Sequence, residues 1–379
     1  MVSNMMTRRR ALLKDETAVI PPEPSGDPWY GVDWFYSNSS PQLTRIGSAT
    51  NFSDPQPATS VSGSGSSPFD NIMPWAGMKR YNIINGVVSY SQDDAGFSQT
   101  DYDTVVYIPE FYYRAEKDTT EQRWTWAISP TAQEGFTKHP GSGRYVGRYH
   151  TSGDSNGVFS KSGVMPLVNT TRAKFRTYSH SKGANWYMLD IATWSALQML
   201  YLVEFANFDS QTKLGTGWVV GSAAVSGGGT DNAAYHTLEI SAGHNQYRWI
   251  EDPFSNCDDW IDGYVGSTSA TYAAASETGY SGGTAGLNNL GFALSDSGSI
   301  RGFGYSDKAP WAFIPDASDS GDSVYSTYVC DRVIARSATS PVGVGGNYNA
   351  NAGFGFFYFY EHSDAYTGAY LGSRLLFIP

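Results

Sequence analysis

The sequence has little charge, and less of it is positive than negative. Only 16% of its 379 residues are charged, and 36 Asp and Glu residues outnumber 25 Lys and Arg residues, which gives a net charge of −11. An average domain is about one quarter charged. Binding to nucleic acid depends on clustered Lys and Arg that neutralise phosphates. The composition therefore argues against a nucleic-acid partner.

Cysteines and long apolar runs are also scarce. Cys257 and Cys330 are the two cysteines, and their separation fits no disulfide framework and no zinc-ligand spacing. We expect two buried reduced thiols, with a bridge between them as the alternative. No run approaches the roughly 18 apolar residues of a membrane span. Arg8, Arg9 and Arg10 precede neither an apolar signal segment nor a small-residue cleavage site. We expect a chain that does not enter the membrane and is synthesised in a cytoplasm.

Glycine and aromatic residues are abundant instead. The chain has 41 Gly, 26 Tyr, 19 Phe and 11 Trp residues. Such a composition favours short strands and loops over long surface helices. We predict an α+β fold that is poor in helix.

Changes in composition along the chain suggest three parts. Residues 1–28 contain a short possible helix and the proline-rich "PPEPSGDP", and are predicted to be an N-terminal arm and linker. Residues 29–114 contain short apolar runs and the turn Asn85-Gly86 between alternating segments, which predict a hairpin within a small β-rich domain. Residues 115–379 are predicted to form one irregular α+β domain with long loops.

The second domain contains the clearest helix signal. Asp190 is a candidate N-cap, and Trp194, Leu197 and Tyr201 follow with helical spacing, so we predict a helix that ends near Phe208. "RWTWAIS" and "GRYVGRYH" are predicted to be strands of a hairpin-like region. Aromatic residues at strand alternation are expected in the core, namely Phe111, Tyr112, Tyr113, Trp124 and Trp126.

Residues 345–372 have a composition of their own. Tyr, Phe, Asn, Ser, Asp and Thr alternate with Gly and Ala, and the segment has no Trp, Met, Lys or Gln. Asn codons randomised at their first two positions, as in adenine-directed retroelement mutagenesis, encode this set. Glu361 is the exception and is either a fixed position or derived from another codon. The alternative is that a Gly-rich aromatic β segment shows the same bias by chance.

Three segments together carry a resemblance to a known family. "WYMLDIATWSALQMLYLVEFAN" resembles its helix. "YRWIEDPFSNCDDWIDGYV" is similar to its "GNVWEWVDG" element, with Asn256, Trp260, Asp262 and Gly263 matching. The ending "GGNYNANAGFGFFYFY…LGSRLLF" resembles its variable repeat. The family is that of C-type lectin-like variable proteins of diversity-generating retroelements, which includes phage major tropism determinants, and more distantly the formylglycine-generating enzymes. The resemblance covers roughly residues 105–379.

The resemblance implies a C-type lectin-like fold for residues 115–379 and a tail receptor-binding function in a phage virion. Implied partners are a host-cell surface protein or glycan, tail components and further copies of the chain, as a homotrimer. We expect the trimer contacts before about residue 115, where aromatic residues look exposed: Trp29, Trp34, Phe35 and Trp75. The alternative is that these residues pack inside their own domain. The alternatives are a formylglycine-generating-type enzyme, which would need a reactive thiol pair, and a bacterial surface adhesin. We expect no enzyme activity.

The predicted ligand-binding residues lie in the variable segment, because Tyr offers large rigid contact area and Asn, Ser and Gly offer adaptable hydrogen bonds. They are Tyr348, Asn349, Asn351, Phe354, Phe356, Tyr358, Tyr360, His362, Asp364, Tyr366, Thr367 and Tyr370. Most of their polar and Tyr members are expected to be exposed on one face. Leu375 and Phe377 are expected to be buried in a closing strand.

Signals for catalysis and metal binding are weak. Residues 279–283 match G-x-S-x-G, but they lie in a Ser/Gly-rich loop without the strand and helix that a nucleophile elbow requires. The six histidines are scattered, which indicates neither a zinc site nor a general base. Two acidic groups lack calcium-loop spacing: Asp316, Asp319 and Asp322, and Asp258, Asp259 and Asp262. Asp258 and Asp259 are expected to be solvated or helix-capping, with calcium as the alternative. We expect no cofactor.

Overall fold

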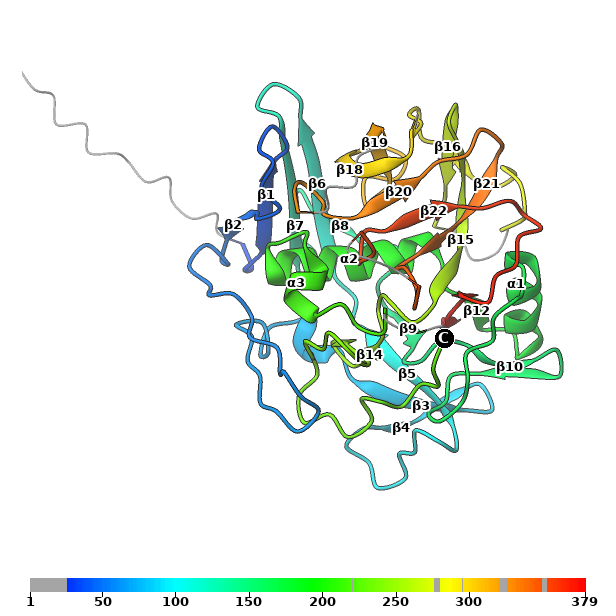
Figure 1. The fold of residues 1–379 in the computed structure, drawn as a ribbon. Coiled ribbons are helices and arrows are strands. Elements are labelled where there is room, and N and C mark those ends of the chain that lie inside the picture. The colour runs from blue at the N-terminus through cyan, green and yellow to red at the C-terminus, as the bar shows by residue number, and fades with distance from the viewer. Residues whose placement is uncertain are drawn as a thin grey trace, which may run out of the picture.

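The computed structural model describes residues 26–379 apart from 220, 222, 276–279, 295, 321–325 and 350–352. The described chain is mostly β-sheet with few helices, as the composition predicted (Figure 1). The predicted N-terminal helix lies outside the described residues, as does most of the arm. None of the helices in the described ranges has the length and apolar character needed to cross a membrane.

Three large sheets make up the described part of the chain. The first has the order β2-β1-β7-β6-β8, with β1 Tyr30–Phe35, β2 Thr44–Gly47, β6 Tyr112–Asp118, β7 Arg123–Ser129 and β8 Thr137–Lys138. The second has the order β12-β24-β9-β5-β3-β4, with β3 Arg80–Ile84, β4 Val87–Ser91, β5 Asp103–Ile108, β9 Arg144–Gly147, β12 Trp186–Met188 and β24 Leu375–Phe377.

The third and largest sheet contains the end of the chain. Its order is β17-β16-β15-β21-β22-β20-β18-β19, with β23 paired to β15. The strands are β15 Asp258–Ser267, β16 Ala270–Ala273, β17 Asn288–Asn289, β18 Gly298–Phe303, β19 Pro315–Ser320, β20 Arg332–Ile334, β21 Ser340–Val344, β22 Phe359–Glu361 and β23 Leu371–Gly372. Two small hairpins complete the described strands: β10 Ser152–Asp154 with β11 Gly157–Phe159, and β13 Gln246–Tyr247 with β14 Ile250–Glu251.

Helix α2, Ile191–Phe205, is the centre of the fold (Figure 1). Asp190 is its N-cap and accepts a hydrogen bond from the Thr193 amide at 2.8 Å, which confirms the predicted start. The helix ends three residues before the predicted Phe208, because Ala206 adopts left-handed backbone with φ 49°. All of its residues are buried, since it packs between sheets on several sides.

The sequence did not predict helices α1, Arg172–Ser181, and α3, Ser210–Leu214, or the 3-10 turn η1, Trp75–Gly77. Helix α1 buries only Arg172, Phe175 and Ser179, so it has little apolar periodicity. Its N-cap Thr171 accepts from the Lys174 amide at 3.3 Å. That cap was the one local signal for the helix.

Local strand predictions hold, but one pairing is wrong. The hairpin β3–β4 turns at Asn85 and Gly86, whose φ angles of 51° and 77° fit a tight two-residue turn. "RWTWAIS" and "GRYVGRYH" supply strands β7 and β9, but these belong to different sheets. β7 pairs with β1 and β6, whereas β9 pairs with β5 and β24. Trp124 and Trp126 of β7 are buried as expected, as are Phe111 and Tyr113, whereas Tyr112 is half-buried and the expectation is wrong for it.

Sheets and core extend across the predicted domain boundary. A boundary after Arg114 falls inside β6, and β1 pairs along its whole length with β7. One apolar cluster runs from Tyr30 to Phe359. Residues 29–114 therefore share their sheets with residues after 114.

The aromatic residues expected to be exposed for trimer contacts differ in their burial. Trp34 and Trp75 are core residues that are 1% and 0% exposed, so this expectation is wrong for them. Phe35 is 41% exposed and Trp29 is half-buried. Leu375 and Phe377 are buried in the closing strand β24, as predicted.

Candidate functional site: the C-terminal aromatic row

Six of the predicted ligand-binding residues form a continuous series of ring contacts along β22 and the segments that precede and follow it. We call this series the aromatic row. It consists of Phe354, Tyr358, Tyr360, His362, Tyr366 and Tyr370, and successive ring centroids are 4.4, 6.4, 3.8, 4.5 and 6.3 Å apart. The rings of His362 and Tyr366 are stacked with an angle of 18° between their planes. The hydroxyl groups of Tyr366 and Tyr370 are hydrogen-bonded to each other.

Strand alternation separates the row from the core. On β22, Phe359 and Glu361 are buried on the inner side, where the Tyr264 ring lies edge-on to Phe359 at 4.9 Å. The Tyr264 hydroxyl donates to Glu361 Oε1 at 2.7 Å. Tyr360 lies between these two residues in sequence and is half-buried on the other side. β22 is held between β21 and β20, which gives the row a rigid support.

The prediction that most polar and Tyr members of the segment are exposed is wrong, because only three of the nine described members are exposed and three are buried. Tyr348, Tyr358 and His362 are buried, at 8%, 1% and 1% exposed. The physical reason is that neighbouring rings cover one another, which alternation along a single strand does not reveal. Tyr360, Tyr366 and Tyr370 are half-buried, and Asn349, Asp364 and Thr367 are exposed. Asn351 lies outside the described residues.

Phe356 and Tyr348 do not belong to the row. Phe356 is a core residue, with its ring 5.3 Å from Trp194 and 5.1 Å from Tyr201. Tyr348 packs in a small cluster with Cys257, and Trp218 and Tyr370 lie against that cluster. Tyr370 therefore connects the row to this cluster, which also contacts Trp218, a residue that the sequence did not single out. The only feature of the sequence that could have indicated Trp218 is its position as a single Trp within a Gly-rich stretch.

Two buried polar atoms near the row have no hydrogen-bond partner among the described residues: Asp258 Oδ1 and His362 Nε2. Asp258 lies on β15, and its other oxygen accepts from Asn347 Nδ2 at 3.1 Å. Burial and the neighbouring Asp259 raise the pKa of Asp258 well above its usual value. Burial, aided by Arg336, lowers the pKa of His362 to about 3, so its ring is neutral. The row is therefore an uncharged surface with unmet hydrogen-bonding capacity below it.

The acidic residues of β15 are structural. Asp258 and Asp259 are buried in the strand, so the expectation that they are solvated or cap a helix is wrong. Asp259 accepts from Arg374 Nε at 2.8 Å, and its Oδ1 lies 3.0 Å from His150 Nδ1. In the other acidic group, Asp316 pairs with Lys117 at 3.1 Å, Asp319 pairs with Arg301, and Asp322 lies outside the described residues.

Both cysteines are buried and free, as expected. Burial raises the pKa of each thiol, with nearby carboxylates adding to the effect. The thiolate, which is the nucleophilic form, is therefore disfavoured at both positions.

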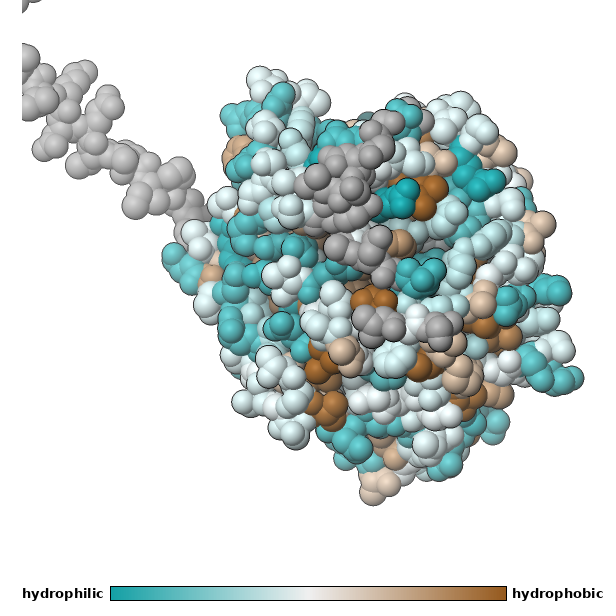
Figure 2. Space-filling view, viewed as in Figure 1, coloured by the Kyte–Doolittle hydropathy of each residue, from teal (hydrophilic) through white to brown (hydrophobic). Residues whose placement is uncertain are grey.

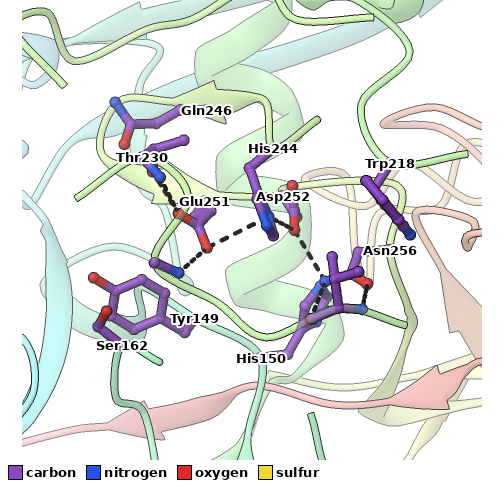
Figure 3. Close-up of polar contacts among 12 residues, drawn as sticks. Tyr149, His150, Ser162, Trp218, Thr230, His244, Gln246, Glu251, Asp252 and Asn256 are labelled. Atoms are coloured by element: carbon purple, nitrogen blue, oxygen red, sulfur yellow. Dashed lines mark hydrogen bonds and ion pairs between the residues drawn. The ribbon is translucent and has the colours of Figure 1, made fainter. Parts of the chain in front are cut away.

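A different polar cluster was missed by the sequence analysis. His244, Glu251 and Asp252 bring one imidazole and two carboxylates together beside hairpin β13–β14 (Figure 3). Burial alone would lower the pKa of His244, but Asp252 and Glu251 outweigh it and raise this pKa to about 9. The spacing of these three residues in the sequence matches no known motif, because a hairpin turn, and not the repeat of a helix, brings their side chains together.

Comparison with known proteins adds no family to this geometry. No family model matches the sequence, and no curated protein matches it.

Proposed function

We propose that the chain is a receptor-binding protein of a phage tail, which binds a host-cell surface protein or glycan through the aromatic row. In this proposal residues 115–379 form a C-type lectin-like scaffold, and a retroelement diversifies residues 345–372. The observation that carries the proposal is the row itself. Six residues, selected from the composition of the segment and from its resemblance to a variable repeat, meet in consecutive ring contacts along and beside β22.

The chemistry of the row suits recognition. Half-buried Tyr rings offer large contact area, lose little side-chain entropy on binding and keep a hydroxyl for hydrogen bonds. Side chains that are already packed against one another need little further ordering when a ligand binds.

The position of Glu361 supports the diversification hypothesis. It is the residue of the segment that the expected codon set cannot encode. It is 0% exposed and faces the core, where Tyr264 and the Arg336 amide hold its carboxyl group. Glu361, which the fold requires, thus faces the core, away from the positions of the segment where variation would alter the surface. The thiol-dependent enzyme alternative gains no comparable support.

A binding assay tests the function. Fluorescently labelled protein would be applied to a panel of bacterial strains and to a glycan array. We expect the double variant Tyr360→Ala/Tyr366→Ala to lose binding at least about 10-fold, since central aromatic side chains carry much of the binding energy. Tyr90→Ala is the matched control, because Tyr90 is 36% exposed on the distant strand β4. Equal binding by both variants would overturn the proposal.

Diversification and assembly have their own tests. A reverse-transcriptase gene and a near-copy of the DNA for residues 345–372 should lie beside this gene, and their absence would remove the diversification hypothesis.

Light scattering on the purified chain should give the mass of a trimer. We propose this assembly because several weak sites that face the same way raise avidity by roughly 10²–10⁴. A monomer mass that persists at micromolar concentration would contradict the proposed assembly.

A further inference from the structure

The cluster of His244, Glu251 and Asp252 has the composition of a metal site. His244 Nδ1 lies 2.7 Å from Asp252 Oδ2 and 3.6 Å from Glu251 Oε1. One ligand atom from each residue lies within 4.8 Å of the others. Figure 3 shows both carboxylates turned toward the imidazole ring.

The local fold explains why these residues meet. Strands β13 and β14 pair Gln246 with Glu251 and are joined by a tight turn at Arg248 and Trp249, with φ angles of 45° and 72°. The pairing continues beyond the strands, since the Asp252 amide donates to Asn245 O at 3.0 Å. The residue before Asn245 is His244, so the hairpin brings the imidazole alongside both acids.

Neighbouring backbone groups hold the cluster in place. Glu251 Oε1 accepts from the Gly228 amide, and Oε2 accepts from the Thr230 amide and hydroxyl, each at 2.7 Å. Gly229 leaves room for the imidazole, because a Cβ atom there would lie 2.0 Å from His244 Cδ2. The carboxylate and the ring are therefore positioned by different parts of the chain before any ligand binds.

Asp252 supplies a second, independent indication of a ligand. It is 1% exposed, as is Glu251, and its Oδ1 has no hydrogen-bond partner within the described ranges. A buried carboxylate oxygen without a partner is costly, so the Asp252 carboxylate retains the capacity to bind a further ligand. The Asp252 carboxylate already points at His244 through Oδ2.

We propose that His244, Glu251 and Asp252 bind one zinc ion. One imidazole nitrogen and two carboxylate oxygens are ligand types that zinc accepts, whereas calcium and magnesium prefer sites made of oxygen alone. Bonds of about 2.0–2.2 Å in tetrahedral geometry place ligand atoms roughly 3.3–3.6 Å apart. The contact between His244 and Glu251 already has this separation, and the contact between His244 and Asp252 must open by less than about 1 Å. The two carboxylates balance the charge of the ion, which takes the place of the proton on His244 Nδ1.

Bound zinc would also support the loop beside the aromatic row. Asp252 Oδ2 accepts from Asn256 Nδ2 at 3.1 Å, and the Asn256 side chain holds Val225 through both backbone groups, at 2.9 and 3.1 Å. The Asn256 carbonyl accepts from the Tyr348 amide at 3.1 Å. Figure 3 shows Asn256 between Asp252 and Trp218. The zinc proposal itself does not depend on what the row binds.

Titration of the full chain with metal tests the proposal. Protein dialysed against EDTA would be titrated with zinc chloride in a calorimeter, with calcium chloride in a parallel run, and melting temperatures measured in each state. We expect one zinc per chain, a higher melting temperature with zinc, and no calcium binding that depends on His244. His244→Gln and Asp252→Asn should each weaken zinc binding at least about 10-fold, since even changes around a ligand cost that much.

His180→Gln is the matched control, because His180 is an exposed histidine on α1. It should bind zinc like the unmodified chain, and circular dichroism would verify that each variant is folded. Asp252→Asn preserves shape, so it keeps the test valid if His244→Gln does not fold. The proposal is overturned if the unmodified chain binds no zinc, or if His244→Gln and Asp252→Asn both bind it normally. The first outcome would leave the cluster as a protonated histidine paired with two carboxylates.

Discussion

Arg176 on α1 donates two hydrogen bonds to Asp262 on β15, from Nε to Oδ2 at 2.6 Å and from Nη2 to Oδ1 at 2.5 Å. The two side chains are 15% and 3% exposed. Paired bonds between a guanidinium and a carboxylate fix orientation as well as distance. This pair therefore holds α1 against the strand that also carries Asp258 and Trp260 near the aromatic row.

Removing one partner of this pair should be costly. Arg176→Met would leave the Asp262 carboxylate buried without its counter-ion, which typically costs about 3–5 kcal/mol of unfolding free energy. Urea denaturation measures this. Lys79→Met is the control, because Lys79 pairs with Asp93 at 2.8 Å on the surface and such pairs contribute under about 1 kcal/mol. Similar losses in both variants would contradict the structural role of the buried pair.

Local features of the fold were predictable from the sequence, and long-range ones were not. The cap at Asp190 and the turn at Asn85 and Gly86 depend on neighbouring residues, so short windows contain the necessary information. The partners of β7 and β9 depend on contacts between distant segments. Strand character was therefore predicted correctly for both, while their pairing was wrong.

The same limit applies to the aromatic row. Its residues were selected from composition, but their burial follows from ring contacts between turns of the chain. Tyr358 is covered by Phe354 on one side and lies against Tyr360 on the other. The cluster at His244 was missed for a related reason, because its pairing across a hairpin has no recurring spacing in sequence.

Single substitutions within the row should differ in how much unfolding free energy they cost. Tyr358→Ala removes a ring that is 1% exposed, and we expect a loss of roughly 3–5 kcal/mol, as for other buried aromatic residues. Tyr360→Ala should cost less than half as much, since Tyr360 is only half-buried. Thermal unfolding followed by circular dichroism compares them. A larger loss for Tyr360→Ala would show that the described packing of the row is wrong.

Trp260 should be essential for the support beneath the row. It is 0% exposed, its Nε1 donates to Thr170 O at 3.1 Å, and its ring lies 5.2 Å from that of His362. Trp260→Ala is expected to cost roughly 3–5 kcal/mol because it leaves a large cavity and an unpartnered carbonyl. Trp260→Phe keeps most of the ring volume and should lose clearly less in the same denaturation assay. No difference between the two variants would argue against a packing role.

Glu361 should make stability depend on pH. Burial raises its pKa from 4.5 to about 7, although Tyr264 and the Arg336 amide donate to the carboxyl group at 2.7 and 2.8 Å. The folded state thus holds the proton more tightly than the unfolded state. The stabilising contribution is complete below pH 4.5 and is lost as pH rises through 7, with a change on the order of 3 kcal/mol.

Glu361→Gln isolates this effect, because Gln has a similar shape and does not titrate. Urea denaturation at pH 5 and pH 8 should show the unmodified chain losing about 2.5 kcal/mol more than the variant between the two pH values. Asp258 also has a raised pKa, but it is present in both proteins and its contribution cancels in the comparison. Parallel pH profiles for the two proteins would mean that Glu361 does not gain its proton on folding, and that the core below β22 is wetter than the structure indicates.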